Sequence, residues 1–102
     1  MHLLETIGRI ILASFFARTI ELRGLTDVPS EGQIILRTLV QSRHKGITSL
    51  KIFECPSFFE NFENMNFLCE FIAQLNNLEE LSIGWGNNLS RQASLKILYI
   101  LK

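Results

Sequence analysis

The apolar positions near the start of the chain recur with the spacing of an amphipathic helix. They fall at steps of one, three and four residues, which places them along one side of a helix over residues 2–16. The next stretch, Arg18 to Gly24, alternates apolar and polar residues, as a half-buried strand does. The stripe that we expect the first helix to bury consists of Leu3, Leu4, Ile7, Ile11 and Phe15.

The order of helix and strand recurs twice further along the chain. The pattern predicts these elements over residues 30–43 (helix), 50–54 (strand), 65–75 (helix) and 80–84 (strand). Cys55 and Pro56 end the second strand, because proline supplies no ladder donor and holds the preceding residue extended. Residues 57–65 are rich in Phe and Asn and show no clear period.

The three predicted strands are evenly spaced. Ile20, Leu50 and Leu81 occupy the same place in each strand, so the interval between successive strands is nearly constant. The segment from Ile47 to Cys55 has the pattern apolar-x-x-Leu-x-Ile-x-x-Cys, and a near copy begins at Leu78. This pattern is typical of the strand and turn of a leucine-rich repeat, L-x-x-L-x-L-x-x-N/C-x-L. A fixed period with alternating elements predicts a stack of repeats.

We therefore predict an α/β leucine-rich-repeat solenoid, a short horseshoe with parallel strands on the concave face and helices on the convex face. A doubly wound sheet is the main alternative, because it also alternates strands and helices. That fold favours strands that are apolar on both faces, whereas these strands keep Glu21, Lys51 and Ser82 on one side. The prediction is one module, residues 1–102, with approximate repeats at 1–28, 29–59 and 60–89 and an irregular or partial repeat at 90–102.

The last stretch departs from the period. Its letters Ser-Leu-Lys-Ile match residues 49–52, but Leu95 follows Leu81 at less than half of the earlier interval. A leucine-rich repeat needs about 20 residues to cross the convex side and return. The segment is either a shortened repeat or docks differently, and the pattern favours a fourth strand over residues 94–102.

Composition narrows the class of function. The 102 residues are 47% hydrophobic and 20% charged, which suits a small domain with a buried core. Lys+Arg and Asp+Glu number 10 each, so a net charge of zero favours neither nucleic acid nor an anionic membrane. Glu5 and Arg9 interrupt the apolar N-terminus, which argues against a signal peptide, and no run of about 18 apolar residues predicts a membrane span. Two cysteines are too few for a disulfide scaffold, so we expect a reduced, cytoplasmic setting.

No arrangement of residues predicts catalysis, a metal site or a cofactor. The chain has no hydrolase, kinase or dinucleotide motif and no Cys/His metal spacing. Cys55 is expected to pack inside its turn and to help satisfy backbone groups there. The alternatives for Cys55 are a reactive thiol paired with His44, which lies on another element, and a disulfide with Cys69. His44 is instead expected at a helix C-terminus, where positive charge is favourable. We therefore expect a protein that is not an enzyme and takes no cofactor.

Three segments of the sequence carry a family resemblance: Ser49-Leu-Lys-Ile-x-x-Cys-Pro-Ser57, Leu75-Asn-Asn-Leu-Glu-Glu-Leu-Ser-Ile83 and Ser94-Leu-Lys-Ile97. Over about residues 45–100 the chain resembles the repeat region of plant nucleotide-binding leucine-rich-repeat disease-resistance proteins. The resemblance implies recognition of another protein in innate immunity. Gly86 stands where Cys or Asn is expected, and the Gly-x-x-x-x-Gly-Lys-Ser/Thr nucleotide loop of that family is absent. The resemblance therefore implies a fragment or truncated relative without nucleotide-driven switching.

The strand period also predicts which side chains meet a partner. If Leu50 and Ile52 point inward, their neighbours in the strand point outward. Register then aligns three rows across the sheet: Glu21, Lys51 and Ser82; Arg23, Phe53 and Gly84; Gly24, Glu54 and Trp85. Neighbouring strands lie about 4.8 Å apart, so Glu21 and Lys51 can pair across the sheet. The predicted partner-binding face consists of Glu21, Arg23, Lys51, Phe53, Glu54, Ser82 and Trp85.

These features predict a non-catalytic protein–protein recognition module whose partner is another protein. Exposed aromatics beside charges are typical of binding hot spots, although Trp85 has the alternative of folding over the sheet end as a local plug. Two other functions stay open: a truncated solenoid with a purely structural role, and the substrate-recognition repeats of a ubiquitin-ligase adaptor. An F-box motif would mark the latter, and none is present. Without polar capping repeats, self-association through the solenoid ends is also expected.

Overall fold

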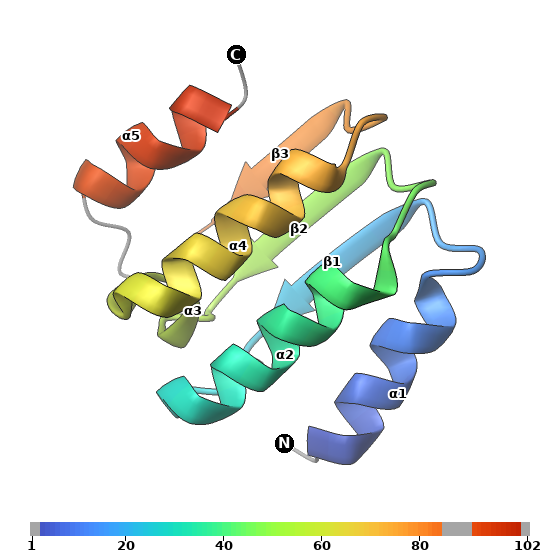
Figure 1. The fold of residues 1–102 in the computed structure, drawn as a ribbon, viewed down its shortest axis with the longest axis horizontal. Coiled ribbons are helices and arrows are strands. Elements are labelled where there is room, and N and C mark those ends of the chain that lie inside the picture. Colours follow the sequence, from blue (N-terminus) through green and yellow to red (C-terminus); the bar gives the residue numbers. More distant parts are fainter. Residues whose placement is uncertain (1–2, 85–90, 101–102) are drawn as a thin grey trace.

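The computed structural model describes residues 3–84 and 91–100, in which helices and strands alternate (Figure 1). The elements of these residues, in chain order, are α1 (Leu3–Ala13), β1 (Thr19–Arg23), α2 (Pro29–Ser42), β2 (Ser49–Phe53), α3 (Ser57–Glu60), α4 (Phe62–Gln74), β3 (Glu80–Ile83) and α5 (Arg91–Ile100). The predicted alternation is confirmed from α1 to β3, and the ends of the elements differ by only a few residues. The chain is thus a small α/β domain.

The strands form one parallel sheet in the order β1-β2-β3. Ile20 pairs with Leu50 and Leu50 with Leu81, as their spacing in the sequence predicts. Parallel neighbours need a crossover connection, and a helix supplies each one here. Figure 1 shows the helices on one face of the sheet, so the other face of the described sheet is open. This excludes the doubly wound alternative for these residues, because that fold covers both faces.

The core lies between the sheet and the helices. Leu50 and Ile52 of β2 have no exposed surface, and neither do Ile35, Leu36 and Leu39 of α2. Burying each such side chain stabilises the fold by about 1.5–3 kcal/mol relative to leaving it exposed. The central strand and the central helix therefore contribute most to holding the two layers together.

A buried polar cluster joins α2, α3 and α4 in the stretch where the sequence shows no clear period. The side chain of Asn61 caps α4 by accepting a hydrogen bond from the backbone N–H of Asn64 at 3.1 Å. Asn64 Nδ2 in turn donates to the carbonyl oxygens of Pro29 and Ser57, at 3.0 and 2.9 Å. A Cβ at Gly32 would stand 2.7 Å from Ser57 Oγ, so the missing side chain lets the helices approach closely. The cluster sets the contact between these helices.

The predicted fourth strand over residues 94–102 is wrong. Residues Arg91–Ile100 form a helix, α5, that packs against α4. A strand would place Leu95 and Ile97 on the same face, but Leu95 is exposed and Ile97 is buried. The physical reason is packing: as a helix against α4, the segment buries Ile97 in the core while Leu95 stays exposed. Residues 101–102 lie outside the described part of the chain.

The orientation of α1 also differs from the prediction. The helix is present, but its buried residue is Ile10, outside the predicted stripe. Leu4 and Phe15, both members of that stripe, are 75% and 79% exposed. Among the described helices, α1 packs mainly against α2, so a narrow part of its apolar surface is covered. The strongly amphipathic helix therefore leaves much of its apolar side facing solvent.

Candidate functional site

The open face of the sheet carries the side chains that alternate with the buried ones. In β1 the odd positions are exposed while Ile20 and Leu22 are buried. In β2 the same alternation leaves Lys51 and Phe53 partly exposed. The face is formed by Thr19, Glu21, Arg23, Ser49, Lys51, Phe53, Glu80 and Ser82.

The first predicted row on this face is confirmed, but Glu21 and Lys51 form ion pairs with other residues. Glu21 pairs in register with Lys51, and Lys51 with Ser82. Glu21 instead lies 3.5 Å from Arg23 Nε on its own strand, while Lys51 Nζ lies 3.9 Å from Glu80 Oε1 on β3. Both pairs are at least a third exposed, so each contributes less than about 1 kcal/mol. These charges therefore stay available to a partner.

The second row forms the most structured part of the face. Arg23 pairs with Phe53 in register, and its guanidinium carbon lies 4.7 Å from the centre of the Phe53 ring. This is a cation–π contact. On its other side the ring lies against Gly84, where an added Cβ would overlap Phe53 Cδ1. The arginine and the glycine together hold an aromatic ring partly exposed on the open face.

The third predicted row does not continue the sheet. Glu54 has a φ of 54° and Gly24 a φ of 57°, so the chain turns away at the end of both β1 and β2. Glu54 is consequently a turn residue and not a member of the strand row. The physical reason is that a left-handed residue breaks the extended alternation on which the row depended. Trp85 lies outside the described residues.

Cys55 has the role predicted for it within the turn. The residue is fully buried, and its Sγ lies 3.5 Å from the carbonyl oxygen of Leu22 and 3.3 Å from that of Phe53. Burial raises the pKa of the thiol, although backbone hydrogen bonds from Leu25 and Gly24 partly oppose this. A raised pKa and burial both oppose nucleophilic chemistry. Cys55 and Cys69 both remain thiols, so the disulfide between them is not formed.

His44 directly follows the C-cap of α2, close to the predicted helix C-terminus, but it is a buried core residue. Helix α2 ends at Ser42, and Arg43 caps it in the left-handed conformation. His44 is 1% exposed, with Nε2 3.0 Å from the carbonyl oxygen of Ile10 and its ring edge-on to Phe71. It therefore connects α1 to α4.

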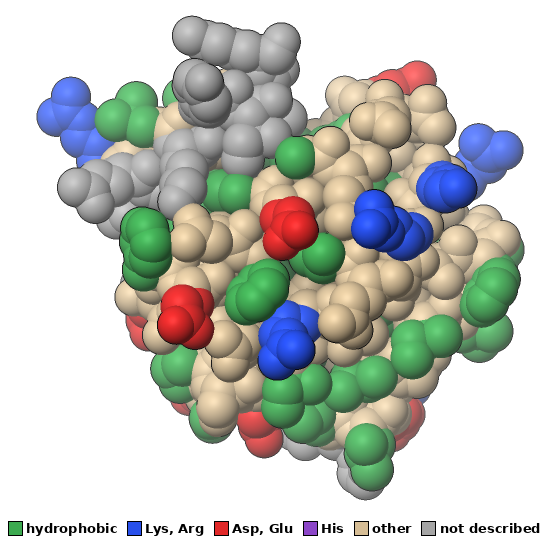
Figure 2. Space-filling model, in the orientation of Figure 1, with side chains coloured by type: hydrophobic (Ala, Val, Ile, Leu, Met, Phe, Trp, Pro, Cys, Tyr) green, Lys and Arg blue, Asp and Glu red, His purple; other side chains and the backbone are tan. Residues whose placement is uncertain are grey.

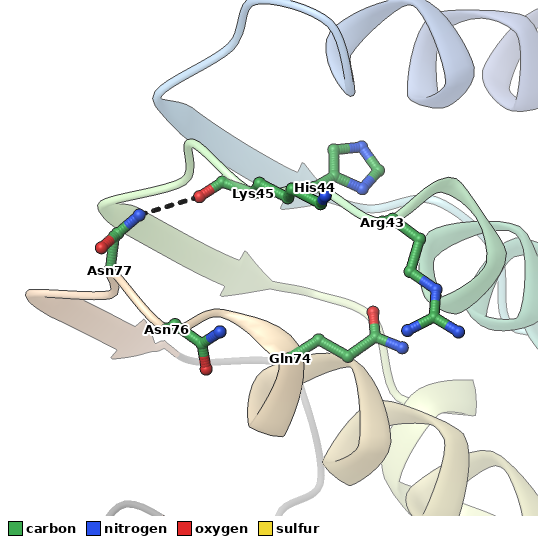
Figure 3. A pocket seen from close by; sticks show the side chains of 6 residues that line it. All are labelled: Arg43, His44, Lys45, Gln74, Asn76 and Asn77. Atoms are coloured by element: carbon green, nitrogen blue, oxygen red, sulfur yellow. Dashed lines mark hydrogen bonds between the residues drawn. The ribbon is translucent and has the colours of Figure 1, made fainter.

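A pocket that we did not predict lies where α2 and α4 end (Figure 3). It has a volume of about 550 Å³ and is lined by Arg43, His44, Lys45, Gln74, Asn76 and Asn77. The repeat period is the signal that could have found it, because Gln74 follows Arg43 at the same interval that separates β2 from β3. The two turns that leave neighbouring helices are therefore stacked, and Asn77 Nδ2 joins them by donating to the carbonyl oxygen of Lys45 at 3.0 Å.

Two buried polar atoms in this pocket lack a hydrogen-bond partner among the described residues: His44 Nδ1 and Gln74 Oε1. A carbonyl oxygen can only accept, so His44 Nε2 donates to the Ile10 carbonyl oxygen. The amide oxygen of Gln74 can only accept, so a hydroxyl or a water could donate to it.

Comparisons with models of known protein families, with curated proteins and with solved structures found no match. Within residues 3–84 and 91–100, no group of three or more His, Cys, Asp or Glu could hold a metal ion. Across that same part of the chain, no helix has the length and apolar character needed to cross a bilayer.

Proposed function

We propose that the chain is a non-catalytic protein-recognition module that contacts its partner with the open face of the sheet. The observation that carries this proposal is the in-register row on that face in which Arg23 stacks on the ring of Phe53. A partly exposed aromatic ring with charges beside it is the kind of anchor that dominates binding energy at protein interfaces. Lys51 and Glu80 extend the polar surround across β2 and β3.

We further propose that the units are leucine-rich repeats, arranged as the short horseshoe of plant immune receptors. The support is threefold: strands in register at nearly constant intervals, helices on one side of the sheet, and Cys55 bonded within its turn. In this proposal the open face is the concave surface of the horseshoe and the helices form its convex side. The partner would be a protein recognised in defence.

The experiment is affinity capture from a plant cell extract with the full chain and three variants. Phe53→Ala and Lys51→Glu change the open face, whereas Phe62→Ala removes a similar ring that is 75% exposed at the start of α4. A specific partner should be retained by the native chain and by Phe62→Ala and lost by the other two. Calorimetry with that purified partner should then show a Kd raised at least about tenfold by Phe53→Ala.

Two results would contradict the proposal. A partner that depends on Phe62 and not on Phe53 would move recognition to the helix side. If no protein distinguishes the native chain from the open-face variants, the structural role is favoured instead. Circular dichroism of each variant separates a lost contact from a lost fold.

A further inference from the structure

The β1 end of the molecule combines an open strand edge with an apolar helix surface. β1 is an edge strand of the described sheet. Gly24 N donates to the Phe53 carbonyl oxygen and Arg18 O accepts from Ser49 N, so even-numbered residues of β1 bond to β2. The backbone groups of Thr19, Glu21 and Arg23 consequently point to the free edge. An edge of this kind is a template for pairing with another strand.

The apolar surface beside this edge belongs to α1 and the turn that follows it. Figure 1 shows α1 at the β1 end of the molecule, and Figure 2 shows hydrophobic side chains on the surface over this region. Phe15 and Phe16, 79% and 71% exposed, together present on the order of 300 Å². Leu4, Ile11 and Leu12, also exposed, extend the patch toward the roughly 500 Å² per partner that a specific interface requires.

The edge of β1 is complementary to itself. If two copies pair antiparallel about a twofold axis at Leu22, Glu21 of one copy faces Arg23 of the other, and the reverse holds by symmetry. Both residues have their backbone groups on the free edge, so each facing pair can exchange both backbone hydrogen bonds. The alternative register at Glu21 would place two carboxylates directly opposite each other, which is unfavourable. Charge therefore favours the register at Leu22 over the register at Glu21, and the net charge of zero adds no overall repulsion.

We propose that the chain forms a symmetric homodimer through the β1 edge and the apolar surface of α1. Pairing at the edge extends the sheet across the twofold axis and brings the two α1 helices together on its helix side. The rest of the open face stays accessible in this dimer, and the dimer does not require the proposed recognition of a partner protein, although Glu21 and Arg23 contribute to both surfaces. The occupant of the α1 surface is thus a second copy of this chain.

Sedimentation equilibrium of the full chain, from low to high micromolar concentration, tests this proposal. The native chain should be a dimer whose affinity falls at least about fivefold in Glu21→Arg or Arg23→Glu, since each change makes two facing pairs repulsive. The double variant, Glu21→Arg with Arg23→Glu, should restore the affinity to within about twofold of native because it restores both pairs. Lys51→Glu, on the central strand, should leave dimerisation unchanged. Phe15→Ala should weaken the dimer at least about tenfold, whereas Phe62→Ala should not.

Cysteine cross-linking tests the register. A mixture of Glu21→Cys and Arg23→Cys chains should form a mixed disulfide dimer under mild oxidation, because facing Cα atoms about 5.5 Å apart suit a disulfide. Neither variant alone should cross-link, and the native chain with its two buried thiols is the control. Cross-linking of Glu21→Cys with itself would overturn this register. A monomer at all concentrations, failure of the double variant to restore affinity, or equal effects of Phe15→Ala and Phe62→Ala would overturn the dimer.

Discussion

At the scale of single residues, Asn64 shows how one polar side chain positions several helices. Its carboxamide donates to the carbonyl oxygens of Pro29 and Ser57 while the residue is 1% exposed. We expect Asn64→Ala to lower the free energy of unfolding by about 2–3 kcal/mol, because it removes two buried hydrogen bonds. Asn77→Ala removes one similar bond at an exposed site and should cost less than about 1 kcal/mol. Urea denaturation measures both, and equal losses would contradict the role of Asn64.

The buried thiol of Cys55 predicts a dependence of stability on alkaline pH. Burial raises its pKa in the folded state, so the unfolded state releases the thiol proton at a lower pH than the folded state does. Above about pH 8.5 the unfolded state binds fewer protons, and stability falls as pH rises. The advantage of the native chain over Cys55→Ala should therefore shrink by up to about 1.4 kcal/mol per pH unit from there upward. Urea denaturation of the native chain and of Cys55→Ala between pH 7 and 10 measures this difference in the free energy of unfolding. A constant difference would show that the thiol titrates alike in both states.

The two residues also show what sequence reveals at this scale. Cys55 could be assigned to its turn because it stands at a fixed position in a repeating pattern. The contacts of Asn64 could not be predicted in this way. One partner, Pro29, belongs to α2, which is distant in the sequence, and the other, Ser57, belongs to the short helix α3. The pairings of Glu21 and Lys51 were also beyond the sequence, since exposed side chains choose among neighbours of nearly equal energy.

At the scale of elements, the turn after each of the first two strands needs a left-handed residue. Gly24 supplies it after β1, and Glu54 supplies it after β2 with nearly the same φ. Gly24→Ala should lower the free energy of unfolding by about 1–2 kcal/mol, because alanine is strained there even though no atom lies within 4 Å of its Cβ. Glu54→Ala places the same residue in the same conformation and should change stability by less than about 0.5 kcal/mol. Thermal unfolding of both variants checks this, and equal losses would contradict the conformational explanation.

Helix α5 gives a second prediction at this scale. Leu95 lies inside α5 and its side chain is 57% exposed, so replacing it loses little packing. Leu95→Pro should lower stability by about 3 kcal/mol and reduce the helical signal at 222 nm, because proline removes a helical hydrogen bond and clashes with the preceding turn. Leu95→Ala, measured alongside by circular dichroism and urea denaturation, should retain the signal. A proline variant as stable as the alanine variant would favour the strand that the sequence first indicated, since proline is tolerated at a sheet edge.

The elements that the sequence predicted correctly are those with the clearest periods. The strands at Ile20, Leu50 and Leu81 were placed in register because a period of two and a nearly constant interval both specify them. The predictions failed where short-range pattern and tertiary context disagree. Ser94-Leu-Lys-Ile matches the letters of β2 yet forms a helix, because its packing against α4 outweighs the local pattern. In α1 the stripe was identified, but only the packing against α2 decides which side of the helix is covered.

At the scale of the whole molecule, burial decreases from the centre to the ends. Leu50 and Ile52 of β2 are completely enclosed, with β1 and β3 on either side. By contrast, α1 buries Ile10 alone among its residues, all of which are described. Elements at the edges of the described sheet lack one neighbour, so they open more readily. The open face includes residues of the central strand β2, and the pocket is lined by residues at the ends of α2 and α4.

This gradient predicts the order of amide hydrogen exchange. Peptides covering β2 should exchange slowest. Peptides covering α1 should exchange at least about tenfold faster, because local opening of α1 exposes little buried surface. Mass spectrometry of the full chain measures both, and equal rates would mean that the domain opens as one cooperative unit. The same experiment bears on the proposed dimer, since pairing covers α1 and the β1 edge but leaves β2 in its place. Protection of α1 and β1 should therefore rise with protein concentration in the native chain but not in Arg23→Glu, while protection of β2 changes least.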